Sequence, residues 1–507
     1  MQTDKNNKLR NARNLVVFVM LFLTSMVFSQ HRGDNLSFQG TDFVNRNGVR
    51  ATAMGGAFTS MSGELDAFFW NPAGLTGLPG FQATANFSSG ERTWRESQDY
   101  RPNRQVVTLS FILDGLYMPN PEFNGWIDNE AFFEDSTYIV NEPLLGADGY
   151  SEEAADWQKQ LDNSGLNNIA AALPFNFSGK EFTVSAGYTR QQNIFNYDRN
   201  QTHLTPTIAW DGYGDLPDRV TAADDSVRIT WSDYERQRTG PLRTISAALS
   251  FALNEQVSFG LSYNRLSGET EEFQSLNRIG NIDLVQGIQI YKFSYDTLNV
   301  QTAGVSDFSA SNLNLGTIVK FGKLSLGANF TPGYTITRDW NSTTTTATAD
   351  SVGTESASGS DKLKVPFSYA VGFNLNPHER FRIAFDIEHR PYSKSEFTLN
   401  REDETLRSWA DQTSFRVGME VKPLSNLSLL AGYRNIPQVF IPDGAADNEN
   451  GPENEFYTIG ASLGISFFRL DAAYEFGSMK YYDVYFSNTN FAYEKSNNLL
   501  LGITLTR

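Results

Sequence analysis

The sequence contains no cysteine and only four histidines in 507 residues, and acidic residues outnumber basic ones. Without cysteine the chain forms no disulfides, has no thiolate nucleophile and cannot hold zinc or an iron–sulfur cluster through sulfur. The formal charge of −17 argues against a nucleic-acid partner, because proteins that bind nucleic acid carry basic surfaces. These absences exclude several classes of enzyme and of binding protein.

Long apolar runs are also missing after residue 30, so the sequence predicts no transmembrane helix there, which would need about 20 apolar residues. Aromatic residues, in contrast, make up 13% of the chain, and Phe alone occurs 38 times. Disordered chains contain few aromatic residues. The composition therefore predicts a folded chain whose apolar residues are dispersed rather than collected in helical spans.

The first 29 residues have the features of a secretory signal peptide. Basic residues precede an apolar run over 15–28, and the small residues Val27 and Ser29 suit a cleavage site. The run is too short for a membrane anchor of about 20 residues. We therefore expect residues 1–29 to be removed on export. The lack of cysteine in such a long exported chain suggests the bacterial cell envelope.

From about residue 167 onward, apolar residues alternate with small or polar ones. Phe182, Val184, Ala186 and Tyr188 are an example, and the last residues repeat the pattern. A period of two predicts strands with one apolar face. Short turns alternate with long polar segments at 192–240, 267–308, 340–361 and 436–455. This asymmetry is typical of an outer-membrane barrel and favours it over a soluble β-sandwich.

The predicted fold class is therefore all-β, a transmembrane antiparallel barrel of about fourteen strands over residues 80–507. The apolar face would meet lipid and the polar face would line the lumen. The first strand is expected at either 80–88 or 105–113. A further external loop is expected at 114–166, where acidic and aromatic residues are concentrated, with one short amphipathic helix possible near its end.

Residues 30–79 do not alternate, and they predict a compact segment that fits inside the barrel as a plug. Gly55 and Gly56 permit close approach of the backbone. Asp66 lies shortly before the sequence Asn71-Pro72-Ala73, in which Asn-Pro favours a turn.

These residues, placed after a signal peptide and before a barrel, resemble the FadL/TodX-type family of outer-membrane transporters of long-chain fatty acids and other hydrophobic compounds. The resemblance is specific over 49–79 and only architectural beyond. It implies a mobile N-terminal hatch with Asn71, Pro72 and Ala73 as its motif. It also implies capture of the ligand by external loops and a sideways exit through a kink in the third strand. Gly187 is the candidate for that kink, with packing against the hatch as the alternative.

Candidate ligand contacts combine aromatic rings with cations, a chemistry that suits an amphipathic anion. The candidates are Trp210, Tyr213, Trp231 and Arg236 in the segment 192–240, and Arg382 and Arg434 in the lumen. The alternative for the lumenal charges is that they pair to hold barrel and hatch together. No histidine pair has the spacing of a metal site, and we expect no catalytic residue, metal or cofactor.

The sequence thus predicts passive transport of a hydrophobic small molecule across the outer membrane of a Gram-negative bacterium, with long-chain fatty acids as the leading substrate. The expected partners are this ligand and outer-membrane lipid, with no nucleic acid. The alternative is a non-conducting barrel of the same family that binds secreted proteins, as in type IX secretion.

Overall fold

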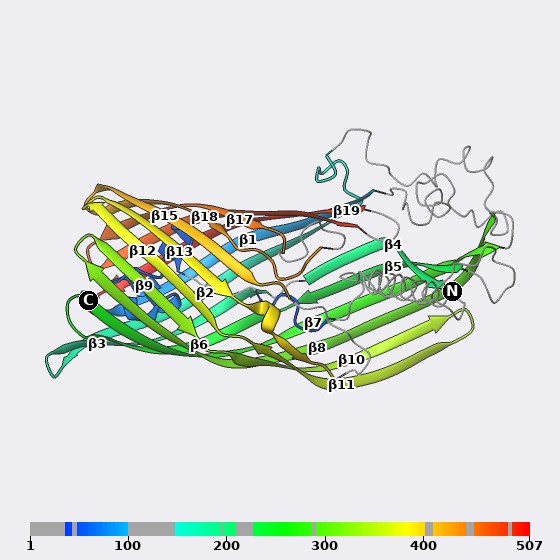
Figure 1. Cartoon of the computed structure of the whole chain (residues 1–507), viewed down its shortest axis with the longest axis horizontal. Helices are drawn as coiled ribbons and strands as arrows, with labels where there is room; N and C mark the ends of the chain where they lie inside the picture. The colour runs from blue at the N-terminus through cyan, green and yellow to red at the C-terminus, as the bar shows by residue number, and fades with distance from the viewer. Residues whose placement is uncertain are drawn as a thin grey trace, which may run out of the picture.

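The computed structural model describes residues 36–42, 48–99, 148–193, 196–208, 227–285, 290–400, 409–442, 451–484 and 489–507. The predicted signal peptide lies outside these ranges. The described chain forms one antiparallel sheet that closes on itself, and a short N-terminal segment, blue in Figure 1, lies within it.

The sheet consists of nineteen strand segments, labelled in chain order. The first nine are β1 (Gln82–Asp99), β2 (Trp157–Phe177), β3 (Lys180–Asn193), β4 (Asn196–Ile208), β5 (Val227–Thr239), β6 (Pro241–Ala252), β7 (Val257–Val285), β8 (Ile290–Phe321) and β9 (Leu324–Thr331). The others are β10 (Tyr334–Thr348), β11 (Val352–Val365), β12 (Ser368–His378), β13 (Phe381–Arg390), β14 (Glu396–Thr398), β15 (Gln412–Leu424), β16 (Leu427–Asn435), β17 (Asn454–Ile465), β18 (Phe468–Val484) and β19 (Thr489–Thr506).

The barrel is closed because β1 pairs with β19 as well as with β2. Five strands are interrupted, as β3/β4, β5/β6, β9/β10, β11/β12 and β13/β14, so the segments make fourteen barrel strands. The predicted fold class is confirmed. Residues 80–88 belong to the first strand, whereas 105–113 lie outside the described residues. Closure removes the two free edges that an open sheet would expose, as a lipid environment requires.

The outer face of the barrel is apolar. Alternate residues such as Ile459, Leu501 and Leu429 are exposed, while the residues between them face inward. Aromatic rings on β2, β3, β6 and β7 stack in a row across the outside, from Phe175 through Phe182 to Phe251. An apolar band with aromatic girdles is the exterior of a bacterial outer-membrane barrel, and the chain is a multi-pass protein of that membrane.

The long polar segments are mostly strands, which corrects the expectation of loops. Segment 192–240 contains β4 and β5, while 267–308 and 340–361 continue β7, β8, β10 and β11. Likewise, residues 157–166 begin β2 instead of forming a helix or loop. Polar strands outside the bilayer still pair with their neighbours, so polarity alone did not distinguish them from loops. In Figure 1 these strands extend to the right, and this part of the barrel is here called the tall wall.

Two interruptions change which residues face the lumen. In β9 the odd-numbered residues face inward, but in β10 the even-numbered ones do, after Pro332-Gly333. The same change occurs between β11 and β12 at Pro366-Phe367. A shift of one residue moves a whole set of side chains to the opposite face. The lumen beside β10 and β11 is therefore lined differently from the lumen beside β9 and β12.

The described part of the predicted hatch lies in the lumen. It comprises residues 36–42, here called the strap, and 48–78, here called the lumenal body. The body contains α2 (Val49–Ala53) and the 3-10 turns η1 (Leu65–Phe69) and η2 (Pro72–Leu75). A further 3-10 turn, η6 (Tyr392–Lys394), separates β13 from β14. None of the helices in the described ranges is long and apolar enough to cross a bilayer.

Candidate functional site in the barrel lumen

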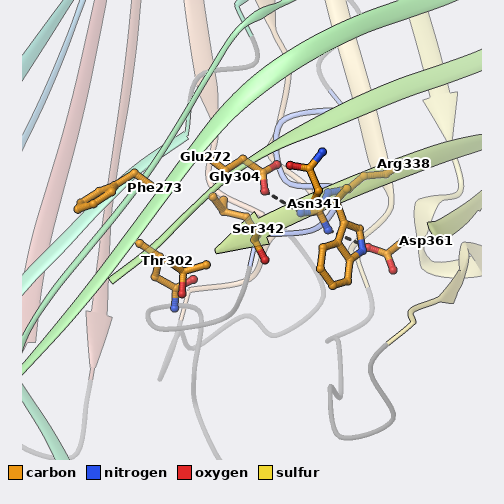
Figure 2. Close-up of a pocket in the computed structure, with 11 residues that line it drawn as sticks. Glu272, Phe273, Thr302, Gly304, Arg338, Asn341, Ser342 and Asp361 are labelled. Carbon is orange, nitrogen blue, oxygen red and sulfur yellow. Dashed lines mark hydrogen bonds and ion pairs between the residues drawn. The ribbon is translucent and has the colours of Figure 1, made fainter. Parts of the chain in front are cut away.

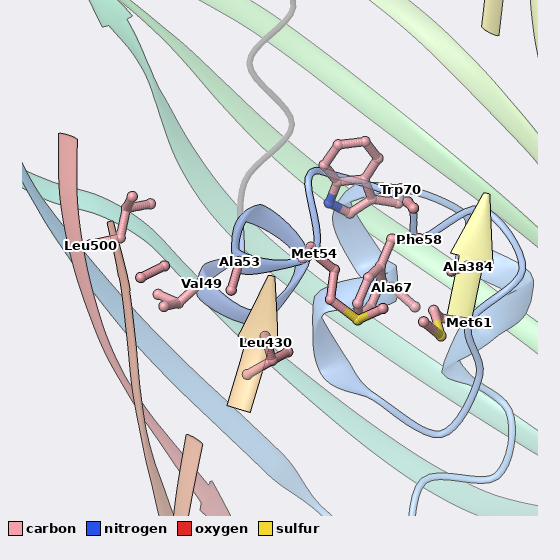
Figure 3. Close-up of a cluster of buried hydrophobic side chains, with 13 residues drawn as sticks. Val49, Ala53, Met54, Phe58, Met61, Ala67, Trp70, Ala384, Leu430 and Leu500 are labelled. Carbon is pink, nitrogen blue, oxygen red and sulfur yellow. The ribbon is translucent and has the colours of Figure 1, made fainter. Parts of the chain in front are cut away.

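The lumenal body packs through a buried apolar cluster. Met54, Phe58, Met61 and Trp70 form its centre, and Ala384, Leu430 and Leu500 reach it from three strands of the wall (Figure 3). These side chains are almost fully buried. The body is therefore packed like a protein core and fills the lumen at its level.

Asn71 joins the body to the wall. Its Nδ2 donates to the backbone oxygens of Thr59 (2.6 Å), Ala328 (3.2 Å) and Thr317 (3.3 Å), and its Oδ1 accepts from Ala73 N at 3.0 Å. The side chain is fully buried. Pro72 follows as the first residue of η2, where its missing N–H costs nothing. The motif residues Asn71, Pro72 and Ala73 thus lie where the body touches β8 and β9.

Glycines allow this close contact. Gly55 and Gly56 have positive φ angles of 63° and 80°, which favour glycine. Gly55 lies against the wall backbone at Tyr433, and Gly56 lies between Trp70 of the body and the side chain of Arg416. On the wall side, a Cβ added to Gly418 would lie 2.5 Å from Met54 O, and one added to Gly460 would lie 2.5 Å from Ala53 Cβ. The body therefore rests on strand backbone in places where any side chain would push it away.

Acidic residues of the body are held by cations and amides. Asp66 Oδ2 accepts from the N–H groups of Arg50 and Ala51 at the start of α2. Burial raises the pKa of Asp66 to about 6. Burial also acts to raise the pKa of Glu64, but the guanidinium groups of Arg50 and Arg382 outweigh it and hold that pKa well below its usual range. Arg50 and Arg382 both pair with Glu420 of the wall as well.

Apolar side chains of the wall pack around Phe38 of the strap, and this cluster is here called the chamber. The chamber residues on the wall are Leu242, Phe308, Ile336, Leu363, Val365 and Tyr392. The ring of Phe38 is fully buried, with centroids 6.3 Å from Phe308 and 6.2 Å from Phe397. Strap and wall thus build an apolar environment inside an otherwise polar lumen.

A belt of buried ion pairs borders the chamber. Arg238 donates to the backbone oxygens of Ser37 (2.9 Å) and Gln39 (2.9 Å) and pairs with Glu272 at 2.7 Å. Arg338 bridges Glu272 and Asp361, with both contacts at 2.7 Å. Charge-assisted hydrogen bonds of this kind fix geometry well. Arg238 therefore holds the strap by its backbone and leaves Phe38 to fill the chamber.

A pocket opens beside this belt on the tall wall (Figure 2). Arg338, Trp340 and Asp361 meet Glu272 there, with Thr302 and Ser342 around them. Leu36, the first described residue of the strap, also lines it. The pocket has a volume of about 50 Å³ and opens to solvent. It is a polar recess directly next to the apolar chamber.

The wall has a seam between its second and third strands. β2 pairs with β3 only up to Asn168 and Thr189, and in the described chain residues 157–166 of β2 pair with β1 alone. Beyond this point side chains bridge the gap. Trp157 Nε1 donates to Arg199 O at 3.1 Å, and Arg190 donates to Ser164 O at 3.5 Å.

Gly187 is not the interruption of the third strand, which corrects the predicted kink. Its register is regular toward both β2 and β6, and the irregularity falls later, between Arg190 and Asn193. A Cβ on Gly187 would lie 2.5 Å from Phe68 of the body. The alternative reading, packing against the hatch, describes its contacts, because the strand passes very close to the body there.

The other predicted ligand contacts are dispersed. Trp210 and Tyr213 lie outside the described residues, and Trp231 lies in β5, paired with Leu204 and Gly280. Arg236 lies 3.6 Å from Asp198. Arg382 pairs with Glu64 and Glu420, and Arg434 pairs with Glu475 at 2.6 Å. Both arginines lie in the lumen. The structure does not bring these residues together, and their contact with ligand stays a prediction.

Sequence reasoning placed Arg238 and Glu272 in external segments and did not select Arg338, because the pairing of these three residues across β5, β7 and β10 leaves no local signal in the sequence. The spacing Gly-x-Ser-x-Gly at 460–464 is that of a nucleophile elbow, but it lies within β17, where Ser462 accepts from Arg50 at 2.8 Å. Within the described ranges, no group of three or more His, Asp or Glu side chains is placed to hold a metal ion.

No protein-family model matches the chain, and no curated protein matches its sequence. Solved structures do match its fold. A FadL homologue of Pseudomonas aeruginosa superposes with a TM-score of 0.56 at 13% identity, over 91% of this chain and 98% of that one. The toluene transporter TodX of P. putida gives 0.52 at 13% identity, over 91% and 98%. The monoaromatic hydrocarbon channel CymD gives 0.50 at 12% identity, over 91% and 97%. The chain therefore has the FadL-type fold that residues 49–79 suggested.

Proposed function

We propose that this protein carries hydrophobic small molecules passively across the outer membrane, with long-chain fatty acids as the leading substrate. The observation that carries the proposal is the chamber, an apolar cluster inside the lumen of a closed barrel that Phe38 of the strap fills. Ligand sites are concave, mostly apolar and equipped with a few polar groups, and the chamber with its ion-pair belt has this composition. The names of the solved neighbours, a toluene transporter and a monoaromatic hydrocarbon channel, agree with an apolar cargo.

The proposed route begins at the external segments, where Trp210, Tyr213, Trp231 and Arg236 would receive the ligand. It continues through the polar recess beside Arg338 into the chamber. The exit is the seam between β2 and β3, where the described residues form no backbone ladder and side chains such as Trp157 close the gap. An apolar molecule that leaves there passes sideways into the membrane, past the lumenal body.

The test is uptake of a labelled long-chain fatty acid, and separately of labelled toluene, by cells that lack their own transporter. Leu363 and Val352 give a matched pair in β11: Leu363 is fully buried in the chamber wall and Val352 is 73% exposed at the far end of the strand. Leu363→Asn should lower uptake because it places an amide in the chamber, while Val352→Asn should leave uptake unchanged at equal surface levels.

Equal uptake by both variants would remove the chamber from the route. No uptake of either compound by the folded wild-type barrel would reject transport of these compounds and favour the alternative, a barrel that binds secreted proteins. Uptake of toluene without the fatty acid would keep the transport function and change the substrate.

A further inference from the structure

We propose that three arginines on the outer face of the barrel bind the phosphate group of a lipid in the outer leaflet of the membrane. They are Arg190 of β3, Arg243 of β6 and Arg265 of β7, here called the arginine triad. The site lies outside the lumen, so it goes beyond the proposed transport and does not depend on which cargo passes.

Strand register places the three side chains next to one another. Arg190 and Arg243 lie directly opposite each other on β3 and β6. Arg265 lies opposite Ile245, two positions from Arg243, which makes it the diagonal neighbour of Arg243. Such pairs have Cβ atoms about 5 Å and about 7–8 Å apart, so the three guanidinium groups can contact one phosphate group together. Arg243, Ile245 and Arg265 are all exposed, because this face of the strands points away from the lumen.

The triad lies at the edge of the apolar band that faces the cell exterior. Arg243 is nine residues from the end of β6 at Ala252, next to the short turn 253–256. At about 3.4 Å per residue and a tilt of about 40°, Arg243 is about 23 Å from that rim, close to the height of about 25 Å that such bands have. Tyr263, two residues from Arg265, is exposed and suits a membrane interface. Short turns face the periplasm, so the triad is level with the outer leaflet.

The described chain provides no counter-charge for the triad. Arg190 donates to Ser164 O at 3.5 Å and Arg265 donates to Ser311 Oγ at 3.1 Å, and both acceptors are neutral. Within the described ranges, none of the three arginines forms an ion pair with a carboxylate. Like charges directly opposite each other on neighbouring strands are destabilising. An anion held between Arg190 and Arg243 would relieve this repulsion.

The surfaces on both sides of the triad favour an amphipathic anion. Further from the bilayer, three exposed carboxylates lie opposite one another on β7, β8 and β10, namely Glu269, Asp307 and Asp339. They repel anions, so the basic level is confined to the edge of the apolar band. A guanidinium group can bind phosphate through two parallel hydrogen bonds. A phosphorylated lipid meets both conditions, because its phosphate would contact the triad while its acyl chains cover Ile245 and the band beyond it.

Titration of the full-length protein in dodecyl maltoside with diphosphoryl lipid A tests the site. Thermal unfolding is the readout, because a ligand that binds the folded state raises the unfolding temperature. Lipid A without its phosphates and inorganic phosphate are the comparison ligands. We expect diphosphoryl lipid A to bind about tenfold more tightly than the dephosphorylated lipid. Equal affinities of the two lipids would show that acyl chains alone bind, and inorganic phosphate with the affinity of the lipid would show a site for the free ion. Either result would overturn the proposal.

Two exposed arginines give a matched pair of variants. Arg243 belongs to the triad, whereas Arg380 lies at the opposite rim, in the short turn between β12 and β13. Arg243→Gln should weaken the binding of diphosphoryl lipid A about tenfold, and Arg380→Gln should leave it unchanged. Without lipid, Arg243→Gln should unfold at the temperature of the wild type or higher, because it removes a like charge opposite Arg190.

Three results would contradict the site. Unchanged binding by Arg243→Gln would show that Arg243 does not contact the lipid. An equal loss of affinity in Arg243→Gln and Arg380→Gln would show attraction to the overall charge alone. A lower unfolding temperature of Arg243→Gln without lipid would show that this arginine serves the fold and not a ligand.

Discussion

At the scale of single residues, the fit between body and wall depends on glycines, which have no Cβ. Gly460 and Gly464 lie four residues apart in β17. A Cβ at Gly460 would lie 2.5 Å from Ala53 Cβ, whereas one at Gly464 would meet nothing closer than 3.8 Å. A methyl group at Gly460 therefore tests the contact between body and wall, whereas a methyl group at Gly464 tests its effect on the strand alone.

We predict that Gly460→Ala destabilises the protein by about 1–3 kcal/mol, as overpacking of a full core does. Gly464→Ala should leave stability nearly unchanged. Urea unfolding in lipid vesicles, followed by tryptophan fluorescence, measures both. If the two variants unfold at the same urea concentration, the wall at Gly460 has room to spare and the seat is looser than the structure shows.

Asp66 makes stability depend on pH through its buried carboxyl group. Its pKa is raised from 3.8 to about 6, so the folded state binds the proton more tightly than the unfolded state. Stability should therefore rise as pH falls from 7 through 6 toward 5, by about 1 kcal/mol. Asp66→Asn keeps an acceptor for the α2 amides and removes the charge.

Unfolding midpoints at pH 7 and pH 5 measure this effect. The part of the pH difference that belongs to Asp66 should disappear in Asp66→Asn and persist in Asp350→Asn, a change at an exposed hairpin tip. The opposite slope, with the Asp66 contribution making the wild type less stable at pH 5 than at pH 7, would mean that the amides of Arg50 and Ala51 stabilise the charged form more than burial opposes it.

At the scale of elements, the strap and the chamber belong together. Arg238 donates to the backbone of Ser37 and Gln39, and Arg390 and Tyr392 donate to Asp42 O at 3.3 Å and 3.4 Å. The strap is therefore held by its backbone at both ends and by Phe38 between them. Loss of a buried Phe side chain usually costs about 3–5 kcal/mol. Hydrogen bonds to a charged group contribute about 1.5–3 kcal/mol each, so the two contributions are comparable.

We predict that Phe38→Ala loosens the strap and leaves an accessible apolar site. Amide exchange in 36–42 should speed up, and an apolar fluorescent dye such as N-phenylnaphthylamine should bind more tightly. Phe177→Ala is the control, because Phe177 is 67% exposed on the outside of the barrel. Unchanged exchange together with unchanged dye binding would show that the hydrogen bonds from Arg238, Arg390 and Tyr392 hold the strap without Phe38.

The sequence predicted the lipid-facing strands well and the lumen poorly, for a physical reason. Lipid demands one apolar face, so alternation at 182–188 is readable residue by residue. Ile336 and Leu363 break that rule by facing inward, because the interruptions at Pro332-Gly333 and Pro366-Phe367 shift the phase of their strands. Asn71 was recognisable by its motif, but its acceptors on Thr317 and Ala328 lie about 250 positions away and carry no local signal.

At the scale of the whole molecule, the apolar exterior has meaning only in a membrane. A soluble barrel of the same shape would expose Leu501 and Phe467 to water, with 51% and 62% of their surfaces accessible. In the outer membrane the two positions differ in depth. Leu501 lies within the apolar outer face of β19, while Phe467 lies in the turn between β17 and β18 at the rim.

Arginine at these two positions distinguishes the environments. In a bilayer, arginine costs about 2–4 kcal/mol at the midplane and about 0–1 kcal/mol near an interface. Leu501→Arg should therefore lower the urea midpoint of unfolding in lipid vesicles, and Phe467→Arg should change it little. Water would hydrate both side chains equally, so two equal midpoints would place the outer face in water. A larger loss at Leu501 would show that the band between the girdles is buried in lipid, which is what a sideways exit from the seam requires.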